Sequence, residues 1–127
     1  MKTRLALCCA VLCFGVASVT FAQDAVKTDP AHYKVEFEND KVRILRFHYG
    51  PHEKSIMHSH PDAVAVFLTD GKVKFTLPDG KSVDASGKAG MAQFTPAQVH
   101  LPENMGDAPM DGVVIELKSG SMAGGSD

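Results

Sequence analysis

The chain has 127 residues, with 13 Lys and Arg against 15 Asp and Glu and a formal net charge of −2. This length suits one domain with one core, and the weak acidity argues against nucleic acid and anionic membranes as partners. All three cysteines, Cys8, Cys9 and Cys13, lie near the amino terminus, so the rest of the chain has no disulfide scaffold, thiolate metal site or cysteine nucleophile.

Residues 1–22 have the three-part layout of a secretory signal peptide. Two basic residues precede an apolar run from Leu5 to about Val19, and small residues flank Phe21. The run is short for a membrane span, which needs roughly 17–25 residues, so we favour a removed signal over an anchor. We therefore expect cleavage after Ala22, a periplasmic or secreted protein, and no membrane contact once the signal is gone.

The remaining chain divides into three parts. We expect a flexible lead-in segment at residues 23–32, a folded unit at residues 33–118, and a flexible Gly/Ser tail at residues 119–127. The tail offers little to bury besides Met122 and Ala123, which is typical of disordered termini.

Apolar residues recur with a period of two almost throughout the folded unit. Turn signals at Asn39-Asp40, Asp70-Gly71 and Asp79-Gly80 separate the runs, and the last two are two-residue hairpin signals. A final apolar run occupies residues 112–118. No segment has the length and period of an amphipathic helix, so the pattern predicts an all-β sandwich or barrel.

His58 and His60 are separated by one residue. In a strand, side chains at i and i+2 point to the same face, so the two imidazoles would lie side by side. Two ligands of one metal ion need this arrangement, but two histidines on a solvated strand face would show the same spacing. His100, on a later run, could meet the pair across the inside of a barrel.

At this point the sequence resembles the cupin family. Its first motif is represented by His58-Ser-His60 and Gly71, with Gly50 two residues further upstream than the motif expects; its second motif is matched by Gly90, Pro96, His100 and Asn104. The resemblance spans about residues 42–118. It implies a single cupin-type barrel, a double-stranded β-helix or jelly roll, with His58, His60 and His100 as metal ligands.

One departure from the cupin pattern concerns the ligand glutamate of the first motif. Counting back from Gly71, its position is taken by Val64. We expect Val64 to share the parity of His58 and His60 and to face inward. The ligands would then be three neutral imidazoles, which leave the charge of a divalent ion uncompensated and favour an anionic or chelating ligand in an open position.

Several functions remain open for such a site. Some three-histidine cupins are iron dioxygenases acting on thiols or diketones, so the resemblance admits a small-molecule dioxygenase. The alternatives are a non-catalytic module that binds or senses a small ligand or the metal itself, and a cupin isomerase. Three imidazoles accept Fe, Zn, Mn, Ni or Cu, and no motif supplies a general base.

Further polar and aromatic residues have expected positions around the site. Gln98 has the parity of His100 and either points toward the metal or fills the rim; Glu116 either faces inward and orients a histidine or lies exposed. We expect Asn104 to pin a loop and His52 to lie at the surface or the cavity mouth. We expect His32 to be solvated. Phe47, Phe67, Phe75 and Phe94 are expected to line the core or the pocket.

The resemblance also implies a homodimer, because cupins commonly pair through edge strands. The charged alternation of Lys34, Glu36 and Glu38 neither favours nor opposes this pairing.

Overall fold

The computed structural model describes residues 23–119, so the expected signal peptide and nearly all of the expected tail lie outside the described residues. The described chain contains one short helix, α1 (Ala25–Thr28), and nine strands. The strands are β1 (Tyr33–Glu38), β2 (Val42–Tyr49), β3 (His58–His60), β4 (Ala63–Phe67), β5 (Gly71–Thr76), β6 (Ser82–Gly87), β7 (Ala92–Thr95), β8 (Gln98–Asn104) and β9 (Met110–Leu117).

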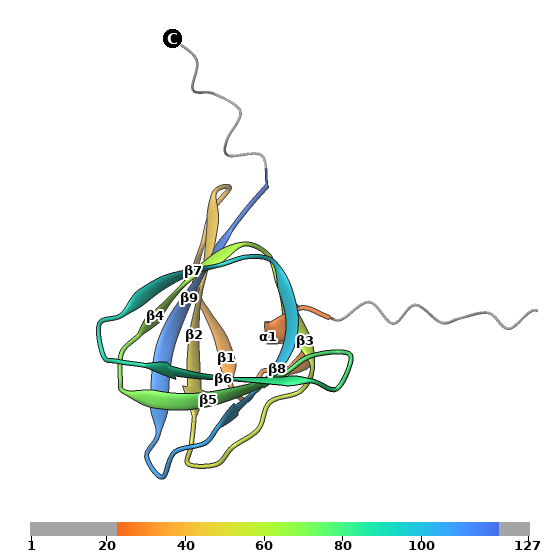
Figure 1. Ribbon diagram of the computed structural model, residues 1–127. Helices are drawn as coiled ribbons and strands as arrows, with labels where there is room; N and C mark the ends of the chain where they lie inside the picture. Colours follow the sequence, from red (N-terminus) through yellow and green to blue (C-terminus); the bar gives the residue numbers. More distant parts are fainter. Residues whose placement is uncertain (1–22, 120–127) are drawn as a thin grey trace, which may run out of the picture.

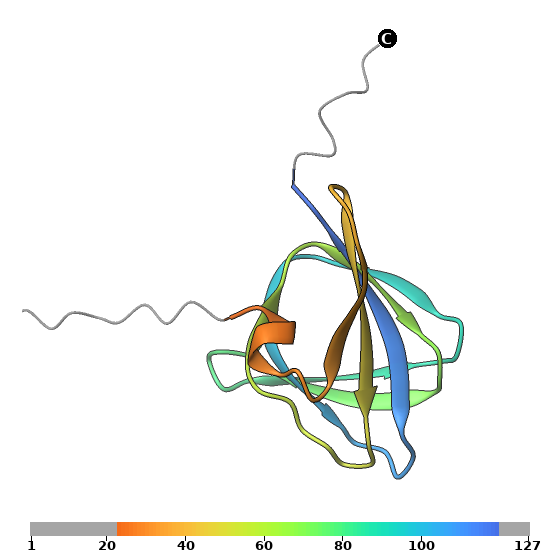
Figure 2. The same cartoon turned by 180° about the vertical axis from the view of Figure 1, so that it is seen from behind.

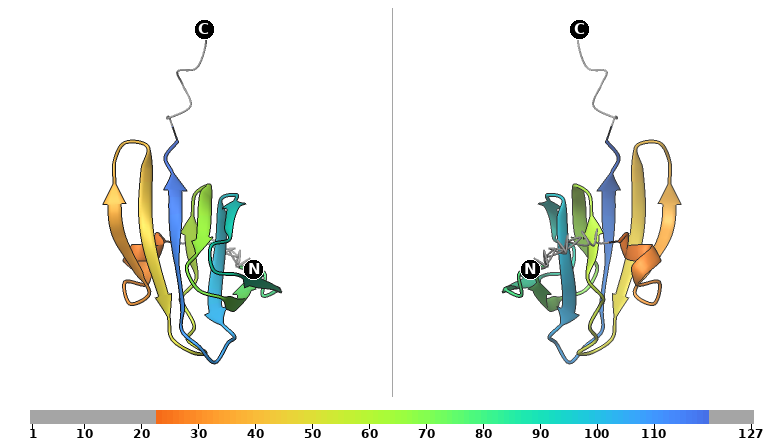
Figure 3. Two further views of the ribbon diagram at one scale, coloured as in Figure 1. Left: turned by 90° about the vertical axis from the view of Figure 1, so that its left-hand side faces the viewer. Right: turned by 90° about the vertical axis from the view of Figure 1, so that its right-hand side faces the viewer.

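The strands form two antiparallel sheets that curve around a common interior (Figure 1). One sheet has the strand order β1-β2-β9-β4-β7 and the other has the order β3-β8-β5-β6. In the side views the strands of the larger sheet stand next to one another, with the β1–β2 pair at one margin (Figure 3). The all-β barrel predicted from the period-two pattern is confirmed.

Two of the three predicted turns join paired strands, and the third does not. Asn39-Asp40 joins β1 to its partner β2, and Asp79-Gly80 joins β5 to its partner β6. Gly80 has φ +85°, in the left-handed region that favours glycine. The hairpin expected at Asp70-Gly71 is wrong, because β4 pairs with β7 and β9 while β5 pairs with β6 and β8. That turn carries the chain from one sheet to the other.

The flexible lead-in segment expected at residues 23–32 is also wrong. Asp24 caps α1 by accepting hydrogen bonds from the backbone of Val26 and Lys27, and Ala25 is fully buried. The helix contacts β1 and β3 on one side of the barrel (Figure 2). The burial of Ala25 holds residues 23–32 in place although most of them are polar. Within residues 23–119, no helix is long and apolar enough to cross a membrane.

The barrel interior is closed by aromatic and aliphatic side chains from both sheets. Leu45, Tyr49 and Val73 are among the buried core residues, and Phe67 and Phe75 pack against them. Gly112 lies under the ring of Phe47, where an added Cβ would come within 2.2 Å of that ring. The missing side chain at Gly112 therefore leaves room for the ring of Phe47 against β9.

The outer face of the larger sheet carries an apolar row, defined as Phe37, Ile44, Ile115, Val64 and Phe94. These residues are direct partners across the successive strands β1, β2, β9, β4 and β7. Phe37 and Phe94, at the two ends, are each more than half exposed. Phe94 was expected to line the core or the pocket, and this expectation is wrong because its parity on β7 turns it to the outside.

Candidate metal centre

The antiparallel pairing of β3 with β8 brings the three predicted ligands together. His58 is the direct cross-strand partner of His100, and His60 is the partner of Gln98. All three imidazoles are buried, with at most 6% of their surface exposed. One ring nitrogen from each lies within 4.8 Å of the others, so the three side chains converge on one point inside the barrel rather than facing water.

Hydrogen bonds at the back of two rings determine which nitrogen faces that point. The Nδ1 atom of His58 donates to the carbonyl oxygen of Ile56 at 2.7 Å, and Nδ1 of His60 donates to Oε1 of Glu116 at 2.8 Å. In a neutral imidazole the other nitrogen then carries a lone pair. Both Nε2 atoms therefore present lone pairs to each other at 3.0 Å. Two lone pairs at this distance repel unless a proton or a metal cation bridges them.

His100 distinguishes between a proton and a metal. Both of its ring nitrogens are buried and have no hydrogen-bond partner within the described chain, although buried polar atoms are nearly always paired. Its ring is held by stacking on Phe75 at a centroid distance of 4.9 Å. A shared proton would reach only His58 and His60, whereas one metal ion would bind one ring nitrogen of each of the three imidazoles, including one of the two unpartnered nitrogens of His100. Two ligands of one ion, bound at about 2.1 Å, lie about 3.0–3.4 Å apart, which matches the observed Nε2 separation.

Burial keeps the ligands in the form that binds metal. It lowers the pKa of His58 to about 4, with a contribution from the nearby His60, and lowers that of His100 to about 3. Both rings are therefore neutral near pH 7. The donor set thus fits a divalent transition metal that accepts imidazole nitrogen.

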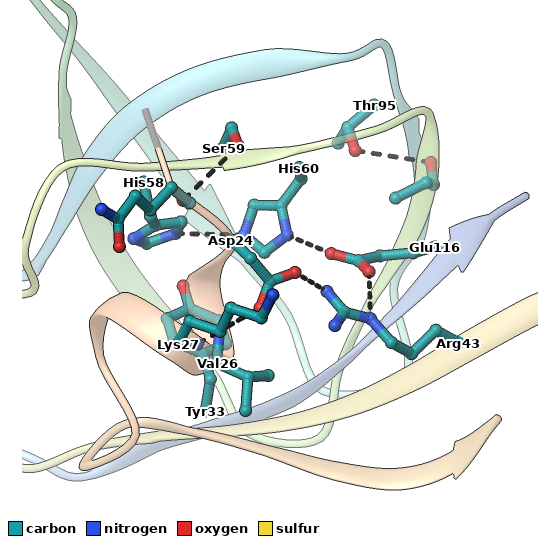
Figure 4. A network of polar contacts seen from close by, with 12 residues as sticks. Asp24, Val26, Lys27, Tyr33, Arg43, His58, Ser59, His60, Thr95 and Glu116 are labelled. Atoms are coloured by element: carbon teal, nitrogen blue, oxygen red, sulfur yellow. Dashed lines mark hydrogen bonds and ion pairs between the residues drawn. The ribbon is translucent and has the colours of Figure 1, made fainter. Parts of the chain in front are cut away.

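A row of charged groups supports His60 from behind (Figure 4). Glu116 binds His60 through Oε1 and accepts a hydrogen bond from Nε of Arg43 at 2.7 Å through Oε2. Arg43 in turn forms an ion pair with Asp24, the residue that caps α1. Burial alone would raise the pKa of Glu116, but the hydrogen bonds from His60 and Arg43 outweigh it and leave the pKa below its usual range. Glu116 is therefore a carboxylate, which fixes the tautomer and orientation of His60.

A cavity of about 70 Å³ opens beside His60 and His100. Its walls are mostly apolar, from residues such as Phe47, Phe67 and Val114. Among the described residues, the polar side chains that line it, besides the two histidines, are Tyr33, Tyr49, Thr95 and Gln98. No carboxylate lines the cavity among residues 23–119. This space can hold a few water molecules or a small ligand next to the three imidazoles.

The expected position of Val64 is wrong. Val64 is half-buried on the outer face, paired with Phe94 and Ile115, and Ala65 faces the cavity instead. Alternation holds only within one continuous strand. Pro61-Asp62 interrupts the chain between β3 and β4, which belong to different sheets, so the parity of His60 is not carried across. The side chain that this strand turns toward the cavity is thus the methyl group of Ala65, and no carboxylate from β4 reaches the site.

The remaining predicted residues fall into two groups. Gln98 lines the cavity and Glu116 faces inward. Asn104 is buried and donates hydrogen bonds to the carbonyl oxygens of Gly50 and Ala108, so it pins loops and lies away from the cavity. His52 is mostly exposed and bonds Asp107 at the surface, outside the cavity lining.

Residues 45–116 match the sequence profile of the cupin domain. The chain belongs to the cupin family. Gly90 of the second cupin motif has φ +86°, which explains why a glycine is needed in the turn before β7.

Solved structures have the same fold. A cupin domain from Bordetella pertussis Tohama I is 27% identical and superposes with a TM-score of 0.64, covering 68% of this chain and 92% of that one. An RmlC-like cupin family protein with a double-stranded β-helix fold from Methanocaldococcus jannaschii is 16% identical, with a TM-score of 0.54 over 67% of this chain and 77% of that one. A double-stranded β-helix protein from Klebsiella pneumoniae is 21% identical, with a TM-score of 0.53 over 70% and 76%. No curated protein sequence matches the chain significantly.

Sequence reasoning missed a second polar group at the cavity. Tyr33 and Tyr49 both line it, and their hydroxyl oxygens are 2.8 Å apart. Behind them, His32 is largely buried between Asp29 and Glu53 and stacks on Tyr49, so the expectation that it is solvated is wrong. The only signal in the sequence was the alternation that placed Tyr33 and Tyr49 at strand ends.

Proposed function

We propose that this cupin holds one divalent transition metal ion at His58, His60 and His100 and uses it to oxidise a small organic ligand with molecular oxygen. The observation that carries the proposal is the convergence of three buried imidazoles, with no carboxylate among them, at the edge of an apolar cavity. A redox-active metal such as ferrous iron supplies the one-electron chemistry that reactions of organic molecules with oxygen require.

The charge of the centre favours an anionic or chelating ligand. Three neutral imidazoles leave a divalent ion with its full charge, so an anion that binds it gains the electrostatic attraction of a low-dielectric site. The carboxylate of Glu116 is not available as a ligand, because both of its oxygens are engaged by His60 and Arg43. Thiolates and enolates of diketones are ligands of this kind.

The residues that line the cavity further restrict which ligands can bind. The side chains of Phe47, Phe67 and Val114 favour a ligand whose remaining atoms, away from the metal, are apolar. A polyhydroxylated sugar in this cavity would leave most of its hydroxyl groups without hydrogen-bond partners. This counts against the sugar isomerase alternative. A non-catalytic module that binds or senses the ligand or the metal remains the second candidate, because its geometry would be the same.

Metal loading followed by oxygen uptake separates the two candidates. The purified protein is loaded anaerobically with ferrous iron, and oxygen consumption is followed with a panel of thiols and diketones. Zinc-loaded protein and His58→Ala are the inactive references, and His48→Ala, at an exposed histidine outside the site, is the matched control. Ligand binding without oxygen consumption under any metal would leave the binding module as the function.

We propose that the protein acts in the periplasm or outside the cell, because residues 1–22 have the layout of a cleavable signal. Fractionation of expressing cells, followed by amino-terminal sequencing, should find a mature chain that begins at Gln23 outside the cytoplasm. Uncleaved protein in the cytoplasm would contradict this.

We also propose that the protein forms a homodimer through the apolar row on the outer face of the larger sheet, rather than through an edge strand. A two-fold axis parallel to β9, the central strand, and lying between the two outer faces would place Phe37 of one copy over Phe94 of the other, twice. The row is thus complementary to itself, as an interface between two identical copies requires. An uncovered apolar face across five strands is also typical of an interaction site.

A further inference from the structure

Residues 23–28, which we call the amino-terminal strap, lie against the strand that carries two of the three imidazoles. The backbone carbonyl oxygen of Gln23 accepts a hydrogen bond at 3.0 Å from the backbone N–H of Ser59, the residue between the two ligands of β3. Asp24 continues this contact as a parallel bridge with Ser59. Helix α1 follows directly and contacts β1 and β3. The main chain of the strap therefore holds Asp24 beside the metal centre.

Both oxygens of the Asp24 carboxylate have partners. Oδ1 accepts hydrogen bonds from the backbone N–H groups of Val26 and Lys27 at 3.0 and 3.2 Å, which caps α1. Oδ2 pairs with Nη2 of Arg43. Burial alone would raise the pKa of Asp24, but the hydrogen bonds from Arg43 and from the helix backbone outweigh it and leave the pKa below its usual range. Asp24 is therefore an anion held in one orientation.

The charged row from Asp24 to His60 carries one negative charge in excess (Figure 4). Arg43 is always protonated and lies between two carboxylates, Asp24 and Glu116, so its positive charge cancels only one of them. Without the charge of Asp24, Arg43 and Glu116 would cancel each other and the row would be neutral. Asp24 thus supplies the net charge that the row presents behind His60.

The source of this charge lies outside the part of the chain that matches the cupin profile. The match covers residues 45–116, so it ends at Glu116 and includes neither Arg43 nor Asp24. Arg43 on β2 is the direct cross-strand partner of Glu116 on β9, and the strap brings Asp24 to Arg43 from the opposite end of the row. The two residues that set the net charge are therefore features of this chain beyond the matched barrel.

We propose that Asp24 tunes the metal centre through its charge, strengthening the binding of the metal ion and weakening the binding of anions to that ion. The inference rests on the proposed metal-binding function and names a residue that regulates the same site. A negative charge behind His60 raises the basicity of that imidazole and attracts the divalent ion across an interior of low dielectric constant. The same charge repels an anionic ligand on the ion. Asp24 acts through Arg43 and Glu116, so it is a positioning residue and touches no ligand itself.

This charge answers a conflict within the site. Three neutral imidazoles leave the divalent ion with its full charge, so an anionic ligand would be held tightly and released slowly. One negative charge in the outer row reduces that attraction without occupying a coordination position. It also stays out of the cavity, which no carboxylate lines among residues 23–119. The site thus keeps an open position and apolar walls while it binds the metal more firmly.

Cobalt-loaded protein allows both effects to be measured. Competition with a metal-binding dye gives the cobalt affinity, and titration with azide gives the anion affinity. Asp24→Asn is the decisive variant, because asparagine caps a helix as well as aspartate does and can still accept hydrogen bonds from Arg43, but carries no charge. We expect it to weaken cobalt binding by about threefold to tenfold, less than the loss of a carboxylate that bonds a ligand directly, and to strengthen azide binding.

Further variants separate charge from structure. Asp24→Glu keeps the charge and should stay closer to the wild type than to Asp24→Asn in both affinities. Asp111→Asn removes an aspartate of similar side-chain exposure, 35% against 27%, which pairs with His48 at the surface, and it should behave as the wild type. If circular dichroism shows that Asp24→Asn does not fold, Asp24→Ser, another uncharged helix cap, decides by the same two affinities.

The two affinities must change in opposite directions. Equal cobalt and azide affinities in the wild type and Asp24→Asn would overturn the proposal. Weakening of both affinities, or equal losses in Asp24→Asn and Asp24→Glu, would also overturn it, because a displaced imidazole rather than a lost charge has these effects. A wild-type protein that takes up no cobalt would overturn the metal site itself and this inference with it. Elemental analysis distinguishes that result from a loaded protein in which Asp24 has no effect.

Discussion

The Nε2 atoms of His58 and His60 lie 3.0 Å apart, and each carries a lone pair because the Nδ1 atom of the same ring donates to an acceptor behind it. This arrangement is unfavourable in an empty site and favourable around a cation. The predictions below follow from it and from the positions of the groups around it.

Removal of the metal should lower the melting temperature of the protein. A ligand that binds only the folded state at one hundred times its dissociation constant adds about 2.7 kcal/mol of stability, which for a domain of this size shifts the melting temperature by roughly 10–20 °C. Thermal unfolding of loaded and chelator-treated protein measures the shift. It should persist in His48→Ala and disappear in His100→Ala, and equal melting temperatures in the wild type would contradict a bound metal.

Glu116→Gln should weaken metal binding by about tenfold to one hundredfold, the usual effect of losing a supporting carboxylate. Glutamine keeps the shape and can still accept from His60, but it lacks the charge that raises the basicity of that imidazole. Competition with a metal-binding dye measures the affinity. Glu103→Gln, which removes an ion pair with Lys74 on the neighbouring strand, is the control; equal affinities in all three proteins would show that Glu116 does not support His60.

Ala65→Glu should tighten divalent metal binding and weaken the binding of anions at the metal. Ala65 faces the cavity, so a carboxylate there can bind the ion and neutralise part of its charge. Val64→Glu is the matched control, because Val64 faces outward and its substitution should leave metal affinity unchanged. Azide titration of cobalt-loaded protein provides the second measurement. A gain in affinity at Val64 rather than Ala65 would mean that the strand has the opposite parity.

Phe94→Glu should convert the proposed dimer to a monomer, since it places a charge at both ends of the self-complementary row. Analytical ultracentrifugation gives the mass in solution. Val83→Glu is the control, because Val83 is equally exposed, at 53% against 56% for Phe94, but lies on β6 of the other sheet. A monomeric wild type, or dissociation by both substitutions, would contradict an interface on the apolar row.

Local patterns determined a large part of this protein before any tertiary contact was considered. The alternation of side chains along a strand is a property of the backbone itself, so the period-two runs predicted an all-β chain and the spacing of His58 and His60 predicted two imidazoles on one face. The resemblance of Gly90, Pro96 and His100 to the second cupin motif implied the third imidazole. The period and the His58–His60 spacing needed only the geometry of single strands.

Tertiary structure alone decided which residues stand behind and beside the three imidazoles. The chain crosses between sheets after His60, so the count of residues could not show that Ala65, rather than Val64, faces the cavity. Arg43 meets Glu116 because β2 and β9 are neighbours, and Glu116 meets His60 of the other sheet across the barrel interior. Ser55 bonds Asp29, which is 26 residues away along the chain. Alternation is inherited along one strand, but contacts between strands depend on register and sheet order, which are properties of the folded whole.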